Sequence, residues 1–374
     1  MKITFLIQSL QFAGSEKVAF DLIKHYRGRN IECSLVTLLH STDRDGRALM
    51  LKELQAMKVP VVELNKRSGL RNAVDILRQL NKAIIRFNPD FIHAHGNTPN
   101  VYAGIRNLLY TKKFTITTLH SGGDDWVRKK DRILEKISLY GVNKIVSVAE
   151  HVASFYQSRF KKSKGKVVVI ENGVDRDKFP AITETEKRKL REDLGVEEGC
   201  PLLINVARID PVKNQSFLIE VAQRLKQSRQ RFTMLFVGNL QDQGYAEQLG
   251  ERIRECGLED RVRLLGSRND VYRLLQISEL FLFPSQFEAS PLALLEAIYS
   301  GLPAICSNIQ ANRRLSQLDK RICIADMNAD QWADHVMRKL ESTGENGLID
   351  RDTMQRRISF DRVADDYLAL CSKS

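Results

Sequence analysis

Glu288 and Glu296 are the carboxylates in the most informative setting, since seven residues separate them across the start of a predicted helix. Carboxylates bind phosphate poorly but accept hydrogen bonds from sugar hydroxyls. The ordinary alternative is a solvated loop glutamate followed by a glutamate on a helix surface. Here Leu292, Leu295 and Tyr299 make much of the helix apolar, and a buried Glu296 needs a polar partner. This setting favours a binding role for both carboxylates.

The helix after Glu288 begins with residues typical of an anion site. Ser290 is predicted as its N-cap, Pro291 as its first residue and Gly301 as its C-cap. Leu292 then lies in the first turn, where backbone N–H groups have no partner within the helix. Together with the helix dipole, these groups predict a site for an anion such as a diphosphate at Ser290, Pro291 and Leu292.

A second candidate site contains Arg208 and Lys213, which follow a predicted strand at 202–207. The planar fork of Arg and the point charge of Lys suit phosphate oxygens. Two solvated loop cations are the ordinary alternative. Both residues come after the carboxyl end of a strand, where parallel α/β sheets bind ligands, and this placement favours phosphate binding.

In the first half of the chain, Gly14 and His120 follow predicted strands at 2–8 and 114–119. Gly14 allows a ligand to approach the backbone closely, but it belongs to no G-x-G-x-x-G, so the nicotinamide-binding fingerprint is missing. His120 lies beside two glycines directly after its strand. A lone histidine is usually structural, whereas one in this position is a catalytic candidate.

The sequence predicts no metal site. His93 and His95 share one face of a strand, but no third ligand accompanies them. Two Asp-Arg-Asp tripeptides, at 43–45 and 175–177, lie in turn-like polar sequence and are interpreted as solvated. The six cysteines are scattered without a C-x-x-C, which indicates buried free thiols in a reducing cytoplasm.

Two series of short apolar runs must position these residues. Most runs are continuous rather than alternating, which is typical of strands buried on both faces of a parallel sheet. Amphipathic helical patterns lie between them, so right-handed βαβ units are expected. The first series is near 2–8, 33–38, 60–64, 91–95, 114–119, 144–149 and 166–170, and the second near 202–207, 232–237, 261–265, 279–283, 302–306 and 321–324.

The two series predict an α/β protein with two Rossmann-like, doubly wound domains facing a cleft. A turn-like Asn172-Gly173-Val174-Asp175 and a polar stretch separate them. The expected organisation is an N-terminal domain at 1–172, a linker at 173–200, a C-terminal domain at 201–351 and a closing helix at 352–374. Whether that helix crosses back to the N-terminal domain is left open.

Composition agrees with a globular protein of about two domains, because 374 residues with 43% hydrophobic and 28% charged residues exclude disorder and a membrane bundle. The net charge of +12 indicates a polyanionic partner. Its distribution is uneven: 31 basic and 17 acidic residues occupy 1–180, against 27 and 29 in 181–374. The N-terminal apolar run is too short for a signal peptide. A cytoplasmic protein, or one peripheral on the inner face of the plasma membrane, is expected.

The ordered set of motifs resembles a family 4 glycosyltransferase with the GT-B fold, over nearly the whole chain. The matching residues are Gly14-Ser-Glu16, Asp90-x-x-His93-x-His95-Gly96, Ser147-Val-Ala-Glu150, Ile170-Glu-Asn172-Gly173-Val174-Asp175 with Phe179, Ala207-Arg208 with Lys213-Asn214, the E-x7-E segment through Ser300-Gly301-Leu302-Pro303, and Ser359 to Tyr367.

The resemblance implies that the C-terminal domain binds a nucleotide sugar. Arg208 and Lys213 would then hold the diphosphate and supply the charge that Mg²⁺ provides elsewhere, so no metal or other cofactor is expected. Glu296 would bind the ribose, Glu288 the transferred sugar, and Gly238 would lie near the nucleoside.

The N-terminal domain would bind the acceptor, with Gly14 near the phosphates and His120 at the reaction centre. The family transfers with retention of anomeric configuration. Two segments depart from the family pattern: Ala289-Ser290, where many members have Gly-Phe or Gly-Leu, and 308–314, which replaces a Gly-Gly loop. Both departures leave the donor sugar open.

The predicted function is retaining transfer of a hexose or N-acetylhexosamine from a nucleotide sugar to a glycan acceptor. A lipid-linked acceptor in bacterial surface polysaccharide or lipopolysaccharide synthesis is expected, and an anionic membrane surface is the expected partner of the basic N-terminal half. The alternatives are a nucleotide-sugar epimerase of related fold and, from another class, a basic nucleic-acid- or membrane-binding protein. The basic clusters at 128–132 and 161–166 contain few aromatics, so no nucleic acid is expected.

Overall fold

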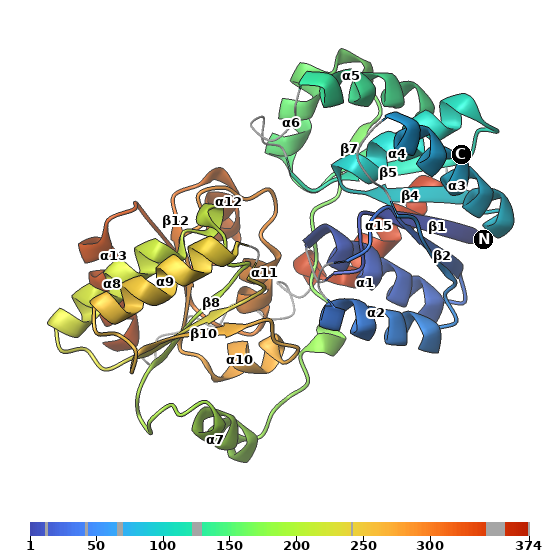
Figure 1. Ribbon diagram of the computed structural model, residues 1–374. Coiled ribbons are helices and arrows are strands. Elements are labelled where there is room, and N and C mark those ends of the chain that lie inside the picture. Colours follow the sequence, from blue (N-terminus) through green and yellow to red (C-terminus); the bar gives the residue numbers. More distant parts are fainter. Residues whose placement is uncertain are drawn as a thin grey trace. The chain divides into compact units, whose positions relative to one another are not determined.

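The structure is a computed structural model that describes residues 1–11, 14–41, 44–65, 70–121, 129–240, 242–341 and 356–372. The chain forms two compact units (Figure 1). Unit 1 consists of Met1–Asn172 together with Phe360–Ser374, and unit 2 consists of Gly173–Ser359. Each unit is built around one parallel sheet.

In the described part of unit 1, seven parallel strands form the sheet in the order β3-β2-β1-β4-β5-β6-β7. Most of the β1, β2, β4, β5 and β6 side chains are buried, because helices cover the sheet. The strands are β1 (Lys2–Ile7), β2 (Glu32–Thr37), β3 (Val61–Glu63), β4 (Phe91–His95), β5 (Phe114–Leu119), β6 (Lys144–Ser147) and β7 (Val167–Val169).

The strand order reverses between β1 and β4, so right-handed crossovers place α1 and α2 on one face of the sheet and the next four helices on the other. The reversal leaves a crevice at the carboxyl ends of β1 and β4, the usual ligand position in such sheets. The helices are α1 (Gly14–Gly28), α2 (Arg44–Ala56), α3 (Leu70–Phe87), α4 (Asn97–Leu109), α5 (Lys129–Ser138) and α6 (Glu150–Arg159), with the 3-10 turns η1 (Leu139–Gly141) and η2 (Lys161–Ser163).

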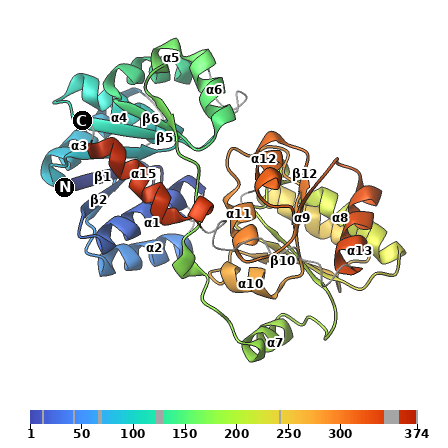
Figure 2. The same cartoon turned by 180° about the vertical axis from the view of Figure 1, so that it is seen from behind.

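Helix α15 (Phe360–Ser372) returns to unit 1 after the whole of unit 2 and packs beside α1, as Figure 2 shows. The Tyr26 hydroxyl donates to the backbone oxygen of Ala364 at 3.2 Å. Tyr367 is buried and its hydroxyl lies 3.3 Å from Thr118 Oγ1 on β5. The closing helix therefore completes the core of unit 1.

Unit 2 repeats the architecture, with six parallel strands among its described residues in the order β10-β9-β8-β11-β12-β13. Here the order reverses between β8 and β11. The strands are β8 (Leu202–Val206), β9 (Thr233–Val237), β10 (Val262–Gly266), β11 (Leu280–Phe283), β12 (Ala304–Ser307) and β13 (Ile322–Ala325). The helices are α7 (Glu184–Asp193), α8 (Gln215–Gln227), α9 (Gln243–Glu255), α10 (Val271–Ile277), α11 (Leu292–Tyr299), α12 (Gln310–Leu318) and α13 (Ala329–Glu341), with the 3-10 turns η3 (Arg176–Lys178) and η4 (Pro211–Lys213).

The segment 173–200, expected as a linker, lies within unit 2. Its helix α7 begins at a capping box, in which Thr183 and Glu186 exchange side-chain and backbone hydrogen bonds. Leu190 and Leu194 then pack on the same hydrophobic cluster as β11 and α11. The sequence 183–191 is polar because only a narrow side of α7 packs against the apolar core of the domain.

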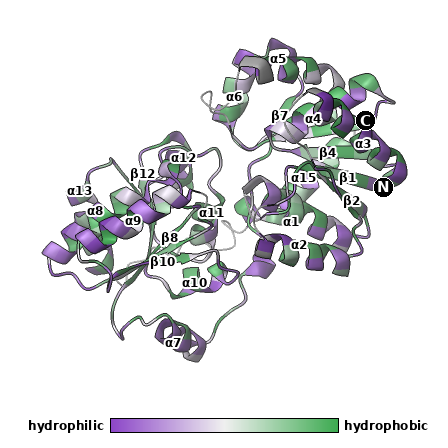
Figure 3. Cartoon of the chain, in the orientation of Figure 1, coloured by the Kyte–Doolittle hydropathy of each residue, from purple (hydrophilic) through white to green (hydrophobic). Residues whose placement is uncertain are grey.

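Each sheet separates apolar layers, and the hydropathy colouring of Figure 3 places the green residues on the strands and on the inner sides of the helices. In unit 2, one cluster packs α8, α9 and α13 with Trp332, while the other packs α10 and α11 with Phe281. All thirteen expected strands are found, and the prediction of two doubly wound α/β domains is confirmed. Among the described helices, none is both long and apolar enough to cross a bilayer.

Gly104 fixes the packing of α4, the helix that follows the histidines of β4. A Cβ at Gly104 would overlap the Ser138 carbonyl oxygen and lie 2.7 Å from Ser138 Cβ. Gly104→Ala should therefore lower the free energy of unfolding of unit 1 by about 1–3 kcal/mol through overpacking. Gly250→Ala is the matched control: it lies inside α9 with no atom within 4 Å, and should raise stability by about 0.5–1 kcal/mol. Calorimetric unfolding measures both, and equal effects would contradict this packing.

Candidate functional site

The loop after β8 is shaped by Asp210, which begins the 3-10 turn η4. Asp210 Oδ1 accepts from the backbone N–H groups of Val212 at 3.0 Å and Lys213 at 3.3 Å. Its other oxygen lies 3.2 Å from Arg208 Nη2. The Asp210 carboxylate thus contacts both predicted cationic residues, Lys213 through its backbone N–H and Arg208 through its side chain. Arg208 still keeps 47% of its side chain exposed.

Lys213 and Glu288 form an ion pair between the loops that follow β8 and β11. Lys213 Nζ lies 2.6 Å from Glu288 Oε1, with only 14% and 12% of the side chains exposed. A backbone bond from Gln286 N–H to the Val212 oxygen, 2.9 Å, ties the same loops together. Two residues predicted from separate motifs are therefore direct partners, and removal of either leaves a half-buried charge uncompensated.

Gly238 follows β9 and supports this loop from beneath. A Cβ at this position would overlap the Ala207 carbonyl oxygen and come within 2.6 Å of the Ala207 carbonyl carbon. Ile209 N–H also donates to the Asn239 oxygen at 2.9 Å. The absence of a side chain lets the loop after β9 lie directly against the Arg208 loop.

Helix α11 begins one residue later than predicted. Pro291 occupies the N-cap position with φ −75° and ψ 93°, and Leu292 is the first helical residue. The expected N-cap, Ser290, is therefore wrong by one position, because Pro291 takes a non-helical ψ in place of helical geometry. At the other end the C-cap is Ser300, so the expected C-cap, Gly301, is also off by one position. With φ +89°, Gly301 is the left-handed residue just past the helix.

Glu296 is buried, with 6% exposed, on the first turns of α11. The Tyr272 hydroxyl donates to Glu296 Oε1 at 3.4 Å. Tyr272 is held in turn by Phe179, whose ring centre lies 4.7 Å away, and Phe179 also packs on Tyr299 at 4.8 Å. The predicted burial of Glu296 with a polar partner is found, and an aromatic cluster positions that partner.

Sequence reasoning missed three residues that build this site: Asp210, Tyr272 and Gln215. Gln215 is fully buried, and its amide nitrogen donates to the Arg208 carbonyl at 2.9 Å. The Asp-Pro step at 210–211 is a recognisable start of a helical turn and could have identified Asp210. Gln215 directly follows the Lys213-Asn214 motif as the first residue of α8, and its position there could have suggested it. Tyr272 lies on α10, far from the motifs in sequence, and only tertiary packing brings it to the site.

In unit 1, parallel pairing of β4 with β5 brings the predicted histidines together. His93 Nε2 lies 3.0 Å from Thr118 Oγ1, and His95 Nδ1 lies 3.0 Å from His120 Nε2. The rings of His93 and His95 have centres 4.1 Å apart, and those of His95 and His120 5.3 Å. His120 thus lies at the carboxyl edge of the sheet, above two buried histidines.

Burial keeps all three rings neutral. Desolvation, followed by the charge of His120, lowers the pKa of His93 to about 3, and desolvation lowers the pKa of His120 to about 4. Desolvation, then the charges of His93 and His120, lowers the pKa of His95 well below its usual value. Within the described ranges, no group of three or more His, Cys, Asp or Glu side chains is arranged to hold a metal ion.

Gly14 is the first residue of α1, and a Cβ there would meet no atom within 4 Å. Next to it, the Ser15 hydroxyl donates to Glu16 Oε2 at 2.6 Å. Residues 12–13, the two glycines after His120 and Asp43 of the first Asp-Arg-Asp lie outside the described residues. The structure places Gly14 and His120 after β1 and β5 of the same sheet.

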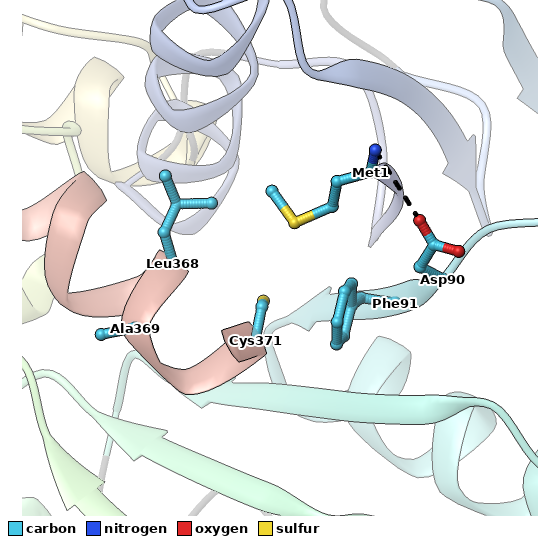
Figure 4. A pocket seen from close by; sticks show the side chains of 6 residues that line it. All are labelled: Met1, Asp90, Phe91, Leu368, Ala369 and Cys371. Atoms are coloured by element: carbon cyan, nitrogen blue, oxygen red, sulfur yellow. Dashed lines mark ion pairs between the residues drawn. The ribbon is translucent and has the colours of Figure 1, made fainter. Parts of the chain in front are cut away.

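A cavity of about 610 Å³ lies at the opposite, amino-terminal edge of this sheet (Figure 4). The Met1 amino group and the Asp90 carboxylate, 4.0 Å apart, stand on one side. None of the predicted site residues lines it. Its lining consists of Met1, Asp90, Phe91, Leu368, Ala369 and Cys371. Because parallel sheets bind ligands at their carboxyl edges, the candidate site lies elsewhere.

Two family models match the chain and together span most of it. "Glycosyltransferase Family 4" matches residues 12–178, and "Glycosyl transferases group 1" matches residues 186–356. The chain belongs to glycosyltransferase family 4. The expected resemblance is confirmed, and this glycosyltransferase has the two sheets of the GT-B fold.

The relatives of this glycosyltransferase include two curated bacterial enzymes. The Escherichia coli UDP-Gal:alpha-D-GlcNAc-diphosphoundecaprenol alpha-1,3-galactosyltransferase is 26% identical over 313 residues, 78% of each chain. The Staphylococcus aureus capsular polysaccharide biosynthesis glycosyltransferase CapH is 36% identical over 168 residues, 44% of this chain and 47% of its own. The Anabaena protein Alr3699/HepE, solved with UDP and glucose, has a similar fold, with a TM-score of 0.84, 20% identity and full coverage of both chains.

The buried histidines make the stability of unit 1 depend on pH. When folding lowers the pKa of a histidine, protons bind more readily to the unfolded state. The stabilisation is therefore complete above about pH 6.5 and is lost as the pH falls toward the pKa of that histidine in the folded state. His93→Phe should therefore flatten the loss of unfolding free energy between pH 7 and pH 5, by roughly 1.4 kcal/mol per pH unit. Urea unfolding at several pH values measures the slope. The exposed His40→Gln is the control, and an unchanged slope in His93→Phe would contradict the assignment.

Proposed function

We propose that this glycosyltransferase transfers a hexose or N-acetylhexosamine, with retention, from a UDP-sugar to a lipid-linked glycan during bacterial surface polysaccharide synthesis. The carrying observation is the polar cluster at the carboxyl edge of the unit 2 sheet, where Lys213 and Glu288 pair beside Arg208. The diphosphoundecaprenol-linked acceptor of the Escherichia coli relative supports the acceptor class. The UDP bound by the Anabaena protein supports the nucleotide.

In this proposal, charged groups of unit 2 bind the donor diphosphate. Arg208, half exposed and braced by Asp210, offers its remaining guanidinium N–H groups. The first backbone N–H groups of α11, from Leu292 onward, add the positive end of a helix dipole. Lys213 pairs with Glu288 and so neutralises this carboxylate before the donor binds. Fixed positive charge stabilises the leaving diphosphate without a metal ion.

The remaining residues position the sugar and the nucleoside. Glu296, held by the Tyr272 hydroxyl, accepts hydrogen bonds from the ribose, and Glu288 accepts them from the transferred sugar. Gly238, which packs against the Arg208 loop, would lie near the nucleoside. Ser290 and Pro291 set where α11 begins, and unit 1 contributes Gly14 and His120, the latter against the sugar. Because both reactants are already held in position, the entropy lost in bringing them together does not add to the barrier of the chemical step.

The first experiment measures donor binding and transfer. UDP should raise the unfolding temperature, because a ligand that binds only the folded state stabilises it. UDP-galactose, UDP-glucose and UDP-N-acetylglucosamine are then tested with N-acetylglucosamine-diphosphoundecaprenol as acceptor. Sugar converted to an epimer without an acceptor would favour the epimerase alternative, and retention is read from the anomeric configuration of the product.

Arg208→Ala and Glu296→Ala should each lower kcat/KM by at least about a hundredfold, since each removes a group that binds the reacting donor. The matched control is Arg252→Ala, which removes an exposed arginine paired with Glu220 on the same unit. Circular dichroism checks that the variants fold. Near-normal turnover in either site variant would refute the site assignment.

We also propose that unit 1 docks on anionic lipid through the surface of η1, η2 and the end of α4. Lys112 and Lys162 lie close to Lys166, whose pKa is lowered first by burial and then by these two neighbours. Lys162 Nζ lies 5.0 Å from the Tyr140 ring, which is 56% exposed. Other exposed apolar side chains on these elements and α5 are Leu108, Leu109, Ile133, Leu134 and Ile137. Basic and apolar groups together suit a membrane interface.

Lys112→Glu combined with Lys162→Glu should abolish binding to vesicles that contain phosphatidylglycerol, because each cation contributes about 1 kcal/mol near an anionic surface. The control, Lys187→Glu with Lys189→Glu on α7, changes the net charge equally. Vesicle sedimentation at low salt measures the bound fraction. Equal loss in both double variants, or equal binding to neutral vesicles, would contradict this docking surface.

A further inference from the structure

The buried ring of His95 has one nitrogen that lacks a hydrogen-bond partner in the part of the chain that the structure describes. Its side chain is 1% exposed. Nδ1 contacts His120 Nε2 at 3.0 Å, whereas Nε2 is buried with no hydrogen-bond partner among the described residues. A buried polar atom without a hydrogen-bond partner destabilises the folded protein. For a ring nitrogen, the size of this effect depends on whether that nitrogen carries the proton.

The contact between His95 and His120 requires one donor and one acceptor. Both rings are neutral at ordinary pH, because burial lowers both pKa values, and a neutral imidazole carries one N–H and one bare nitrogen. If His120 donated, the His95 proton would lie on Nε2, as a buried N–H with no acceptor. If His95 donates, only a bare nitrogen is left unpaired. Orphaned buried N–H groups are the rarer of the two.

We propose that His95 is a positioning residue that donates from Nδ1 to His120 Nε2 and thereby fixes His120 with its own proton on Nδ1. His120 can then donate a hydrogen bond from Nδ1 and cannot act as a base through Nε2, because that nitrogen is engaged. This inference rests on the proposed function only for the ligand: the Nδ1–H of His120 donates to an oxygen of the transferred sugar.

The surroundings hold His95 in this orientation. Phe5 stacks against its ring with the ring centres 6.0 Å apart, and the His93 ring packs against it in a tilted orientation with the centres 4.1 Å apart. His93 is itself engaged with Thr118, which also contacts the Tyr367 hydroxyl of α15. The tautomer of His120 therefore depends on packing that extends from β4 to the closing helix.

The test reads the tautomer directly. In protein labelled with nitrogen isotope at its histidine rings, long-range proton–nitrogen correlation spectra distinguish a protonated ring nitrogen from a bare one. Without ligand, we expect His120 to show a protonated Nδ1 and a bare Nε2, and His95 to show a protonated Nδ1. His120→Gln and His95→Asn assign the signals. A proton on His120 Nε2 would overturn the proposal.

Three variants separate positioning from simple packing. His95→Asn keeps an N–H donor near the position of Nδ1 and should preserve the His120 tautomer. His95→Leu removes the donor and should give a mixture of tautomers. His93→Leu removes a packing ring from the same strand but keeps the His95 donor, so it should change the His120 tautomer less than His95→Leu does. A wild-type spectrum for His120 in His95→Leu would overturn the proposal. If that variant does not fold, the spectra of the wild-type protein and of His95→Asn still test the proposal.

Turnover of UDP-galactose provides the functional readout. His95→Leu should lower kcat at least about tenfold, as a wrong tautomer does in other active sites, with His95→Asn restoring most of it. His95→Leu with normal kcat would overturn the link from tautomer to reaction. A spectrum with the proton on Nδ1 supports the proposal even if the protein consumes no UDP-galactose, an outcome that counts against the proposed donor alone.

Discussion

The parallel pairing of β8 with β11 is the constraint on which the rest of the candidate site depends. Leu203 and Ile204 are in register with Leu280 and Phe281, so both strands end at the same edge and their loops meet. Asn205 continues the connection, since its amide donates to the Leu282 carbonyl at 2.7 Å. Once the loops are adjacent, an acid on one and a base on the other can pair. The chemistry of the site is thus a consequence of sheet geometry.

Much of this arrangement follows from the sequence alone, for a physical reason. Continuous apolar runs must be buried on both faces, so the strands were predictable, and with them the positions of Arg208, Lys213, Glu288 and His120 after strands. Side-chain partners were not predictable, because they depend on loops that are distant in sequence. The pairing of Lys213 with Glu288 and the support of Glu296 by Tyr272 both cross such distances. The sequence also could not show that the N-cap of α11 is Pro291 rather than Ser290, because this depends on the local backbone geometry.

The two units use similar sheets for different electrostatic tasks. Unit 2 gathers ionised side chains at the carboxyl edge and compensates them in pairs, so its site is preorganised for a charged ligand. Unit 1 gathers imidazoles there and keeps them neutral by burial. A neutral ring directs hydrogen bonds without attracting or repelling an anion. Basic residues of unit 1 such as Lys112 and Lys162 lie instead outside the sheet, close to Lys166.

The return of α15 to unit 1 has a consequence for biosynthesis. During translation, β1 to β7 leave the ribosome well before the helix that covers Tyr26 and Thr118. Domains generally fold as units in the order of synthesis, but here the earlier domain waits for a segment made after the later one. Unit 2 can fold in the meantime as a contiguous insertion. The nascent chain therefore passes through a stage in which unit 2 is complete and unit 1 still exposes apolar surface to chaperones.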